Sequence, residues 1–301
     1  MPDSSILHPM ADRTSKGNPG APTALPPVSD DRYLDLLKRV LTGLVRPEML
    51  RPLRPAKGTA KRWLLAPIQG LLRQFGIELA RRVAIDPEAR ADGKDWPAEA
   101  ETMIGLKRLD NLQACIEDVV RAGIPGDIIE TGVWRGGAAI FARAALEVLG
   151  DTERAVWVAD SFRGLPRPRD GAHPLDARDD YRLWSWTQLA VPREEVERNF
   201  ARYSLLDARV RFLEGWFEDT LPAAPIERLA ILRLDGDLYS STMVALRTPY
   251  SKLSVGGYVI VDDYGAIEGC KQAVHNFRGE HGITEEFRWI DWAGVYWRRE
   301  R

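Results

Sequence analysis

The alternation of apolar and polar positions becomes regular at about residue 102 and continues to the C-terminus. Short apolar runs alternate there with stretches whose apolar residues recur at helical spacing. This pattern predicts an α/β fold with a doubly wound, mostly parallel sheet, which ends in an antiparallel hairpin within FRWIDWAGVYWRR. We expect seven strands, and the five outside the hairpin lie in GDIIETG, RAVWVADSF, VRFLEGWF, LAILRLDGD and GGYVIVDDY.

The N-terminal third follows a different pattern. Residues 1–29 are rich in Pro, Gly, Ser and Asp and contain few large apolar side chains, so we expect a disordered tail. The segment SDDRYLDLLKRVLTGLV then carries an apolar stripe at helical spacing behind a capping Ser or Asp. The predicted divisions are therefore a tail (1–29), a helical, basic N-terminal extension (30–100) and the α/β domain (101–301).

Between residues 46 and 95 the extension is basic and interrupted by proline. Its segment WLLAPIQGLLRQFGIELARRV is predicted to form an amphipathic helix. One interpretation is an element that lies on a membrane surface or gates substrate entry. The other is a helix packed on the main domain or on a second subunit, and we favour this one.

The overall composition argues against several classes of protein. The formal net charge of -2 offers no basic surplus for binding nucleic acid. Cys115 and Cys270 are the only cysteines, and neither has a Cys or His at metal spacing, which argues against a disulfide framework or a zinc site. The N-terminus lacks the pattern of a secretory signal, and no run approaches the roughly 20 apolar residues of a membrane span. We expect a cytoplasmic protein with no membrane span.

The segment ETGVWRGGAA places Gly132, Gly136 and Gly137 between a predicted strand and a predicted helix. Such glycines permit a tight turn and close approach of a ligand, although the pattern differs from the dinucleotide-binding GxGxxG. Glu130 would repel a phosphate but attract the sulfonium and ammonium groups of S-adenosylmethionine. The next strand ends at Asp160, where doubly wound folds bind ribose hydroxyls. We predict S-adenosylmethionine as the cofactor; the alternative is that the glycines only form the turn.

Four aspartates follow the last two predicted parallel strands. Asp235, Asp262 and Asp263 lie at the carboxyl ends, where ligands of such sheets bind. Converging carboxylates repel one another unless a cation lies between them, and oxygen ligands without His or Cys indicate Mg²⁺, with Mn²⁺ and Ca²⁺ as alternatives. Asp237 would face the same side as Asp235 and is a candidate general base. The alternative is that Asp262 and Asp263 form a turn and Asp237 caps a helix. We favour the metal site.

Five segments closely resemble the macrocin O-methyltransferase (TylF-type) family: TMIGLKRLDNLQ, IPGDIIETGVWRGGA, VWVADSFRGLPRP, LRLDGDLYSST and GGYVIVDDYGAIEGCKQAV. The resemblance extends from about Thr102 to Arg299. It implies a Rossmann-like methyltransferase domain that transfers methyl from S-adenosylmethionine to a sugar hydroxyl of a glycosylated natural product, with Mg²⁺. A homodimer is expected from the resemblance and from the apolar N-terminal helix.

The resemblance also implies roles for individual residues. Asp235, Asp262 and Asp263 would bind the metal, and Asp237 would be the base. The resemblance, together with the glycine-bearing turn after the first predicted strand, gives these cofactor-binding candidates: Thr102, Met103, Glu130, Gly132, Gly136, Asp160, Ser161, Gly215, Trp216 and Phe217.

Other functions and elements stay open. A catechol-type metal-dependent O-methyltransferase shares the fold and the carboxylates, and a non-catalytic S-adenosylmethionine-binding or membrane-associated protein is supported only by the basic extension. The segment DARDDYRLWSWTQLAVPREEVERNF, with Trp184 and Trp186, is either a lid over the acceptor or an insertion anchored by its tryptophans. His173 and His275 are isolated, and we expect both on the surface; the alternative for His173, near the end of the second predicted strand, is that it orients the substrate.

Overall fold

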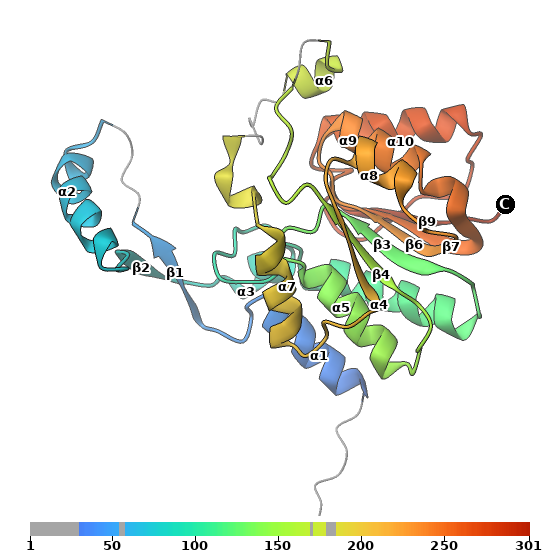
Figure 1. The fold of residues 1–301 in the computed structure, drawn as a ribbon, viewed down its shortest axis with the longest axis horizontal. Coiled ribbons are helices and arrows are strands. Elements are labelled where there is room, and N and C mark those ends of the chain that lie inside the picture. Colours follow the sequence, from blue (N-terminus) through green and yellow to red (C-terminus); the bar gives the residue numbers. More distant parts are fainter. Residues whose placement is uncertain (1–29, 54–57, 169–170, 179–184) are drawn as a thin grey trace, which may run out of the picture.

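A computed structural model describes residues 30–53, 58–168, 171–178 and 185–301; the predicted tail and Trp184 lie outside the described residues. A central sheet is enclosed by helices (Figure 1). The strands of this sheet are β3 (Asp127–Thr131), β4 (Val156–Asp160), β5 (Val210–Glu214), β6 (Leu229–Leu234), β7 (Leu253–Val261), β8 (Arg288–Trp289) and β9 (Val295–Arg298).

The sheet confirms the predicted architecture. Its order is β5-β4-β3-β6-β7-β9-β8, with β3 to β7 parallel, β9 antiparallel to β7, and β8 antiparallel to β9. Every residue of β6 is buried, as expected for a central strand of a sheet that is covered on both faces. The carboxyl ends of the parallel strands lie along one edge, and this edge carries the candidate site.

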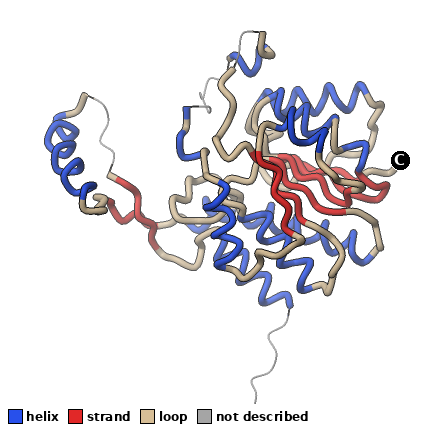
Figure 2. The backbone as a smooth tube through the Cα atoms, in the orientation of Figure 1, coloured by secondary structure: helices blue, strands red, loops and turns tan. Residues whose placement is uncertain are grey.

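Two groups of helices cover the faces, and the strands lie between them (Figure 2). Helices α4 and α5 form one apolar core with α1 and α7, and helices α8, α9 and α10 form the other. From residue 87 onward the helices are α3 (Pro87–Ala91), α4 (Leu106–Arg121), α5 (Gly137–Val148), α6 (Pro174–Ala177), α7 (Arg193–Arg202), α8 (Phe217–Ala223), α9 (Tyr239–Arg247) and α10 (Glu268–Glu280), with short 3₁₀ helices η2 (Thr187–Leu189) and η3 (Tyr250–Lys252).

The first predicted helix is confirmed as α1 (Asp30–Leu41). Its buried residues Leu34, Leu37 and Leu41 join the core formed by α4 and α5. The start of the extension therefore packs as part of the α/β domain, and the division at residue 100 stays a prediction.

The amphipathic helix predicted for residues 63–83 is correct only in its first half. Helix α2 (Ala60–Gln74) ends before Gly76, whose φ is +71°. The residues that follow form β2 (Ala80–Ala84), which pairs antiparallel with β1 (Glu48–Pro52). The prediction fails because the pairing partner lies some thirty residues earlier in the chain, beyond the reach of helical periodicity.

The unit β1–α2–β2 projects from the main body (Figure 1). On α2 and just after it, Trp63, Leu64 and Phe75 are 80%, 71% and 72% exposed. Packing of this helix on the main domain is therefore wrong, whereas packing on a second subunit stays a prediction. No helix in the described part of the chain has the length and apolar content that a bilayer crossing requires.

Candidate active site

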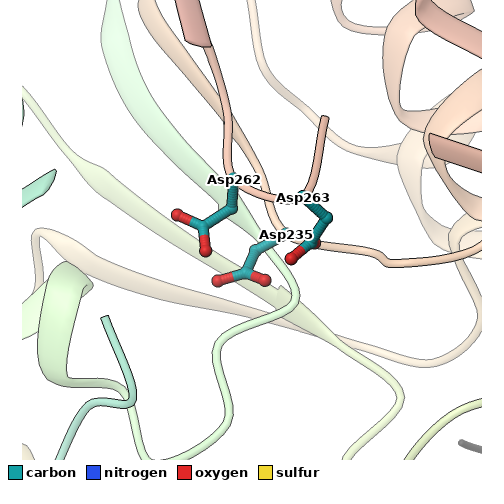
Figure 3. Close-up of side chains that lie close together, drawn as sticks. All are labelled: Asp235, Asp262 and Asp263. Carbon is teal, nitrogen blue, oxygen red and sulfur yellow. The ribbon is translucent and has the colours of Figure 1, made fainter. Parts of the chain in front are cut away.

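The ends of β6 and β7 bring three aspartates together (Figure 3). Asp235 directly follows β6, and Asp262 and Asp263 directly follow β7. One carboxylate oxygen of each lies within 4.8 Å of the others. Since β6 and β7 are parallel neighbours, their ends meet at the same edge of the sheet. The three predicted metal ligands thus lie where one cation could contact all of them.

Two buried arginines hold this aspartate cluster in place. Arg233, on β6, donates from Nη1 to Asp235 Oδ2 at 3.0 Å and from Nη2 to Asp262 Oδ1 at 2.5 Å. Arg108, on α4, donates to Asp262 Oδ2, and its Nε donates to Asp291 Oδ2 at 2.8 Å. Both oxygens of Asp262 are therefore fixed, and each keeps a second lone pair for a metal ion.

When all of its carboxylates are ionised, the cluster has an excess of negative charge. Arg233 also donates to Glu130, so with Asp291 five carboxylates face two guanidinium groups. Asp263 Oδ2 is buried and has no hydrogen-bond partner among the described residues. Burial, with neighbouring carboxylates adding to it, raises the pKa of Asp263 well above its usual value and that of Asp235 to about 6. A divalent cation would relieve both effects, so these residues fit a metal ion such as Mg²⁺.

A cavity lies next to the cluster, bordered by the turns after β3, β4 and β5; we call it the first cavity. Asp235 and Asp237 line it, so the aspartates form part of its wall. The predicted cofactor residues that line it are Met103, Gly132, Asp160, Ser161, Gly215, Trp216 and Phe217.

Glu130 and Asp160, at the ends of β3 and β4, differ in their surroundings. Burial raises the pKa of Glu130 to about 8, against the opposite effect of Arg233. Its Oε2 has no hydrogen-bond partner within the described part of the chain. Asp160 accepts hydrogen bonds from the backbone N–H groups of Val133 and Phe162, each at 2.8 Å. Asp160 therefore holds the turn after β3 in place, and it also lines the first cavity.

Gly136 lines neither this cavity nor the one described below. Its φ is +85°, and a Cβ there would lie 2.7 Å from Val196 Cγ1 on α7. The missing side chain thus permits close packing of α7 against the start of α5. The contact with a cofactor predicted for Gly136 has no support in this geometry.

Gly132 joins the first turn to the aspartate cluster. Its φ is +86°, and a Cβ would lie 1.8 Å from the backbone oxygen of Asp235. Glycine here lets the chain after β3 approach the chain after β6, so that the first cavity and the cluster share a wall.

We expect Gly132→Ala to lower the free energy of unfolding by roughly 2–5 kcal/mol, because it adds a backbone overlap to an unfavourable φ. Gly150→Ala is the matched control, since its φ is +69° but no described atom lies within 4 Å of the added Cβ. The control should lose only about 1–2 kcal/mol. Denaturant unfolding measures both, and equal losses would show that the approach to Asp235 does not matter.

Three residues other than glycine hold left-handed backbone at this edge. Trp134 follows β3 with φ 48°, Phe162 follows β4 with φ 56°, and Asp237 follows β6 with φ 57°. For bulky residues this conformation is uncommon and is kept only where the surroundings enforce it. The coincidence at three strand ends indicates that the turns are shaped by the site.

The turn that carries Asp237 is anchored by a distant segment. Asp176, buried on α6, accepts hydrogen bonds from Tyr239 N at 2.7 Å and Ser240 N at 3.0 Å, at the start of α9. Asp176 thus accepts two backbone hydrogen bonds at the N-terminus of α9. Asp237 lines both cavities, which is the place expected of a base.

A second cavity adjoins the first. Met103, Trp134, Leu189, Asp235 and Asp237 line both. The remaining predicted site residues that line the second cavity are Thr102, Glu130, Asp262 and Asp263. An aromatic group also faces it, comprising Trp96, Trp134, Trp186 and Trp292.

The roles of Arg108, Arg233 and Trp96 were not predicted from the sequence. For Arg233 the sequence held a signal, because burying a charged residue inside the apolar run LAILRLDGD costs free energy unless the charge is paired. Arg108 and Trp96 offered none, since their partners come from distant segments. Of the two histidines expected on the surface, His275 is exposed, whereas His173 is partly buried and stacks on the Tyr239 ring with centroids 3.6 Å apart.

Known proteins resemble this chain over most of its length. A sequence model of the macrocin-O-methyltransferase (TylF) family matches residues 30–299. The 8-demethyl-8-(2,3-dimethoxy-alpha-L-rhamnosyl)-tetracenomycin-C 4'-O-methyltransferase of Streptomyces olivaceus is 50% identical over 269 residues, 89% of this chain and 92% of that protein. The mycinamicin III 3''-O-methyltransferase of Micromonospora griseorubida is 46% identical over 275 residues, 91% of this chain and 98% of that protein.

A solved structure shows the same fold. The O-methyltransferase NovP is 45% identical and superposes with a TM-score of 0.77, covering 90% of this chain and all of NovP. The observed fold and the match to the family model both agree with the resemblance predicted from the sequence motifs. The chain belongs to the macrocin-O-methyltransferase family, a family of methyl-transferring enzymes.

Proposed function

We propose that this enzyme transfers a methyl group from S-adenosylmethionine to a sugar hydroxyl of a glycosylated natural product, and that it requires a divalent metal ion, with Mg²⁺ as the first candidate. The observation that carries the proposal is the pair of adjoining cavities that share Asp235 and Asp237. The name of the tetracenomycin relative specifies a rhamnosyl group, which supports a sugar acceptor.

The first cavity suits S-adenosylmethionine. The glycine-bearing turn lets a ligand approach the backbone, and Trp216 and Phe217 offer an apolar surface for the adenine ring. Asp160 keeps lone pairs that can accept hydrogen bonds from ribose hydroxyls. Glu130 lines the adjoining second cavity, and a cationic group of the cofactor nearby would stabilise the ionised form of its buried carboxylate, whose Oε2 is unsatisfied.

The second cavity suits the acceptor. A cation held by the three aspartates would supply a Lewis acid that polarises the acceptor hydroxyl. The Asp237 carboxylate takes the proton from that hydroxyl, because it faces the acceptor cavity and the cofactor cavity at once. Arg108 and Arg233 hold Asp262 and Asp235 in position, so much of the acceleration would come from orientation and fixed charges.

The test is transfer of labelled methyl from S-adenosylmethionine to a panel of deoxysugar glycosides and simple catechols, with Mg²⁺ and with EDTA. We expect label on a glycoside, lost in EDTA and restored by added Mg²⁺. If label appears only on catechols, the acceptor is a catechol and the proposed sugar acceptor is wrong. Label on a glycoside that persists in EDTA would reject the metal requirement and leave the sugar acceptor standing.

A further inference from the structure

We infer that Trp96, Trp134 and Trp186 form a binding surface for an apolar ring system of the aglycone, beside the sugar that is methylated; the inference rests on the proposed function. The second cavity is polar on the side of the aspartate cluster and aromatic on the side of these tryptophans. A glycoside has the same division, since its sugar carries the hydroxyls and its aglycone the apolar area.

The Trp96 ring contacts the other two rings, although the three tryptophans come from separate segments. Trp96 meets Trp134 edge to face at 6.0 Å between centroids and meets Trp186 edge to face at 5.8 Å. Trp134 lines both cavities, whereas Trp96 and Trp186 line only the second. The aromatic row therefore joins the wall that the two cavities share, at Trp134, to the wall of the second cavity, at Trp96 and Trp186.

The innermost ring is rigidly held. Trp134 Nε1 donates to the backbone oxygen of Gln188 at 2.9 Å, and the Arg135 guanidinium lies 4.4 Å from the Trp134 ring centroid. The left-handed φ of Trp134 is unusual for so large a residue, and these contacts keep it there. A fixed indole loses little conformational freedom on binding, which favours its use as a recognition surface.

Trp96 and Trp186 are better placed to discriminate between acceptors. Both are partly exposed, so each has free area for a ligand. Apolar and aromatic rings prefer offset or edge-to-face packing against indole, which adds to the area they bury. We therefore assign specificity for the aglycone to Trp96 and Trp186.

Binding to protein loaded with S-adenosylhomocysteine and Mg²⁺, measured by isothermal titration calorimetry, tests this. The ligands are 2-naphthyl α-L-rhamnoside and methyl α-L-rhamnoside, which differ only in the aglycone. Wild type should bind the naphthyl glycoside at least about tenfold more tightly, and Trp96→Ala and Trp186→Ala should each remove roughly tenfold of that preference. Trp96→Phe should retain most of it.

Trp289→Ala is the matched control, because Trp289 is 59% exposed, contacts Tyr264 and lines neither cavity. The inference is overturned if wild type binds both glycosides with equal affinity or does not bind the naphthyl glycoside. It is also overturned if the alanine variants keep the preference of wild type, or lose the same affinity for both glycosides. Methyl transfer is followed separately. Tryptophan-dependent binding without transfer would reject the proposed function alone, and transfer without discrimination would reject the inference alone.

Discussion

Replacement of Asp263 by asparagine should abolish metal binding and strongly slow methyl transfer, while making the metal-free protein more resistant to heat. Asp263 Oδ2 is buried with no hydrogen-bond partner among the described residues, and burial and the charge of Asp237 raise its pKa. The ionised side chain therefore destabilises the metal-free fold. With the cation bound, the same carboxylate is a ligand, so we expect kcat/KM to fall roughly 10³-fold, or about 4 kcal/mol.

The gain in stability should depend on pH. Because the pKa of Asp263 is higher in the folded than in the unfolded chain, this group stabilises the fold fully only below its unfolded pKa of about 4. That contribution is lost as the pH rises through the folded pKa. The difference in Tm between Asp263→Asn and wild type, measured in EDTA, should therefore grow as the pH is raised above about 4.

Asp262→Asn is the matched comparison and should behave oppositely. Both Asp262 oxygens accept hydrogen bonds from buried arginines, and disruption of such a pair costs up to about 3–5 kcal/mol. Mg²⁺ should raise the Tm of wild type but of neither variant, since a ligand stabilises only a fold that binds it. An Asp263→Asn enzyme that keeps its activity and its response to Mg²⁺ would reject the three-aspartate metal site.

The main elements of the α/β domain were predictable because local pattern and global arrangement agree there. Apolar runs such as LAILRL are buried strands, and the parallel sheet then requires their carboxyl ends to meet. This logic alone brings Asp235, Asp262 and Asp263 together. It fails for residues 80–84, where pairing with β1 decides the conformation against the helical pattern.

The parts of the site that could not be predicted depend on contacts between distant residues. Arg108 reaches Asp262 across 154 positions of the chain, and Asp176 reaches Tyr239 across 63. The row of indoles likewise joins three segments that have no periodic relation. Periodicity identifies which residues end a strand, but the partners that orient their side chains follow only from the packed fold.

Replacement of Asp237 by asparagine should lower kcat by about 10²- to 10⁴-fold, the range expected for loss of a general base. The substitution keeps the shape of the side chain, and asparagine tolerates the φ of 57° at this position as well as aspartate does. The turn should therefore stay intact, anchored by Asp176. Affinities for S-adenosylhomocysteine and Mg²⁺, measured by titration calorimetry, should remain close to those of wild type.

The pH–rate profile separates a base from a residue that only shapes the turn. In wild type, kcat should fall on the acid side as the base is protonated, and in Asp237→Asn this limb should disappear, because the carboxylate that takes the proton has been removed. Asp219→Asn, an exposed aspartate on α8, is the control and should leave the profile unchanged. A variant at position 237 with a reduced rate but the same acid limb would show that another group takes the proton, and Asp237 would then act only through the geometry of its turn.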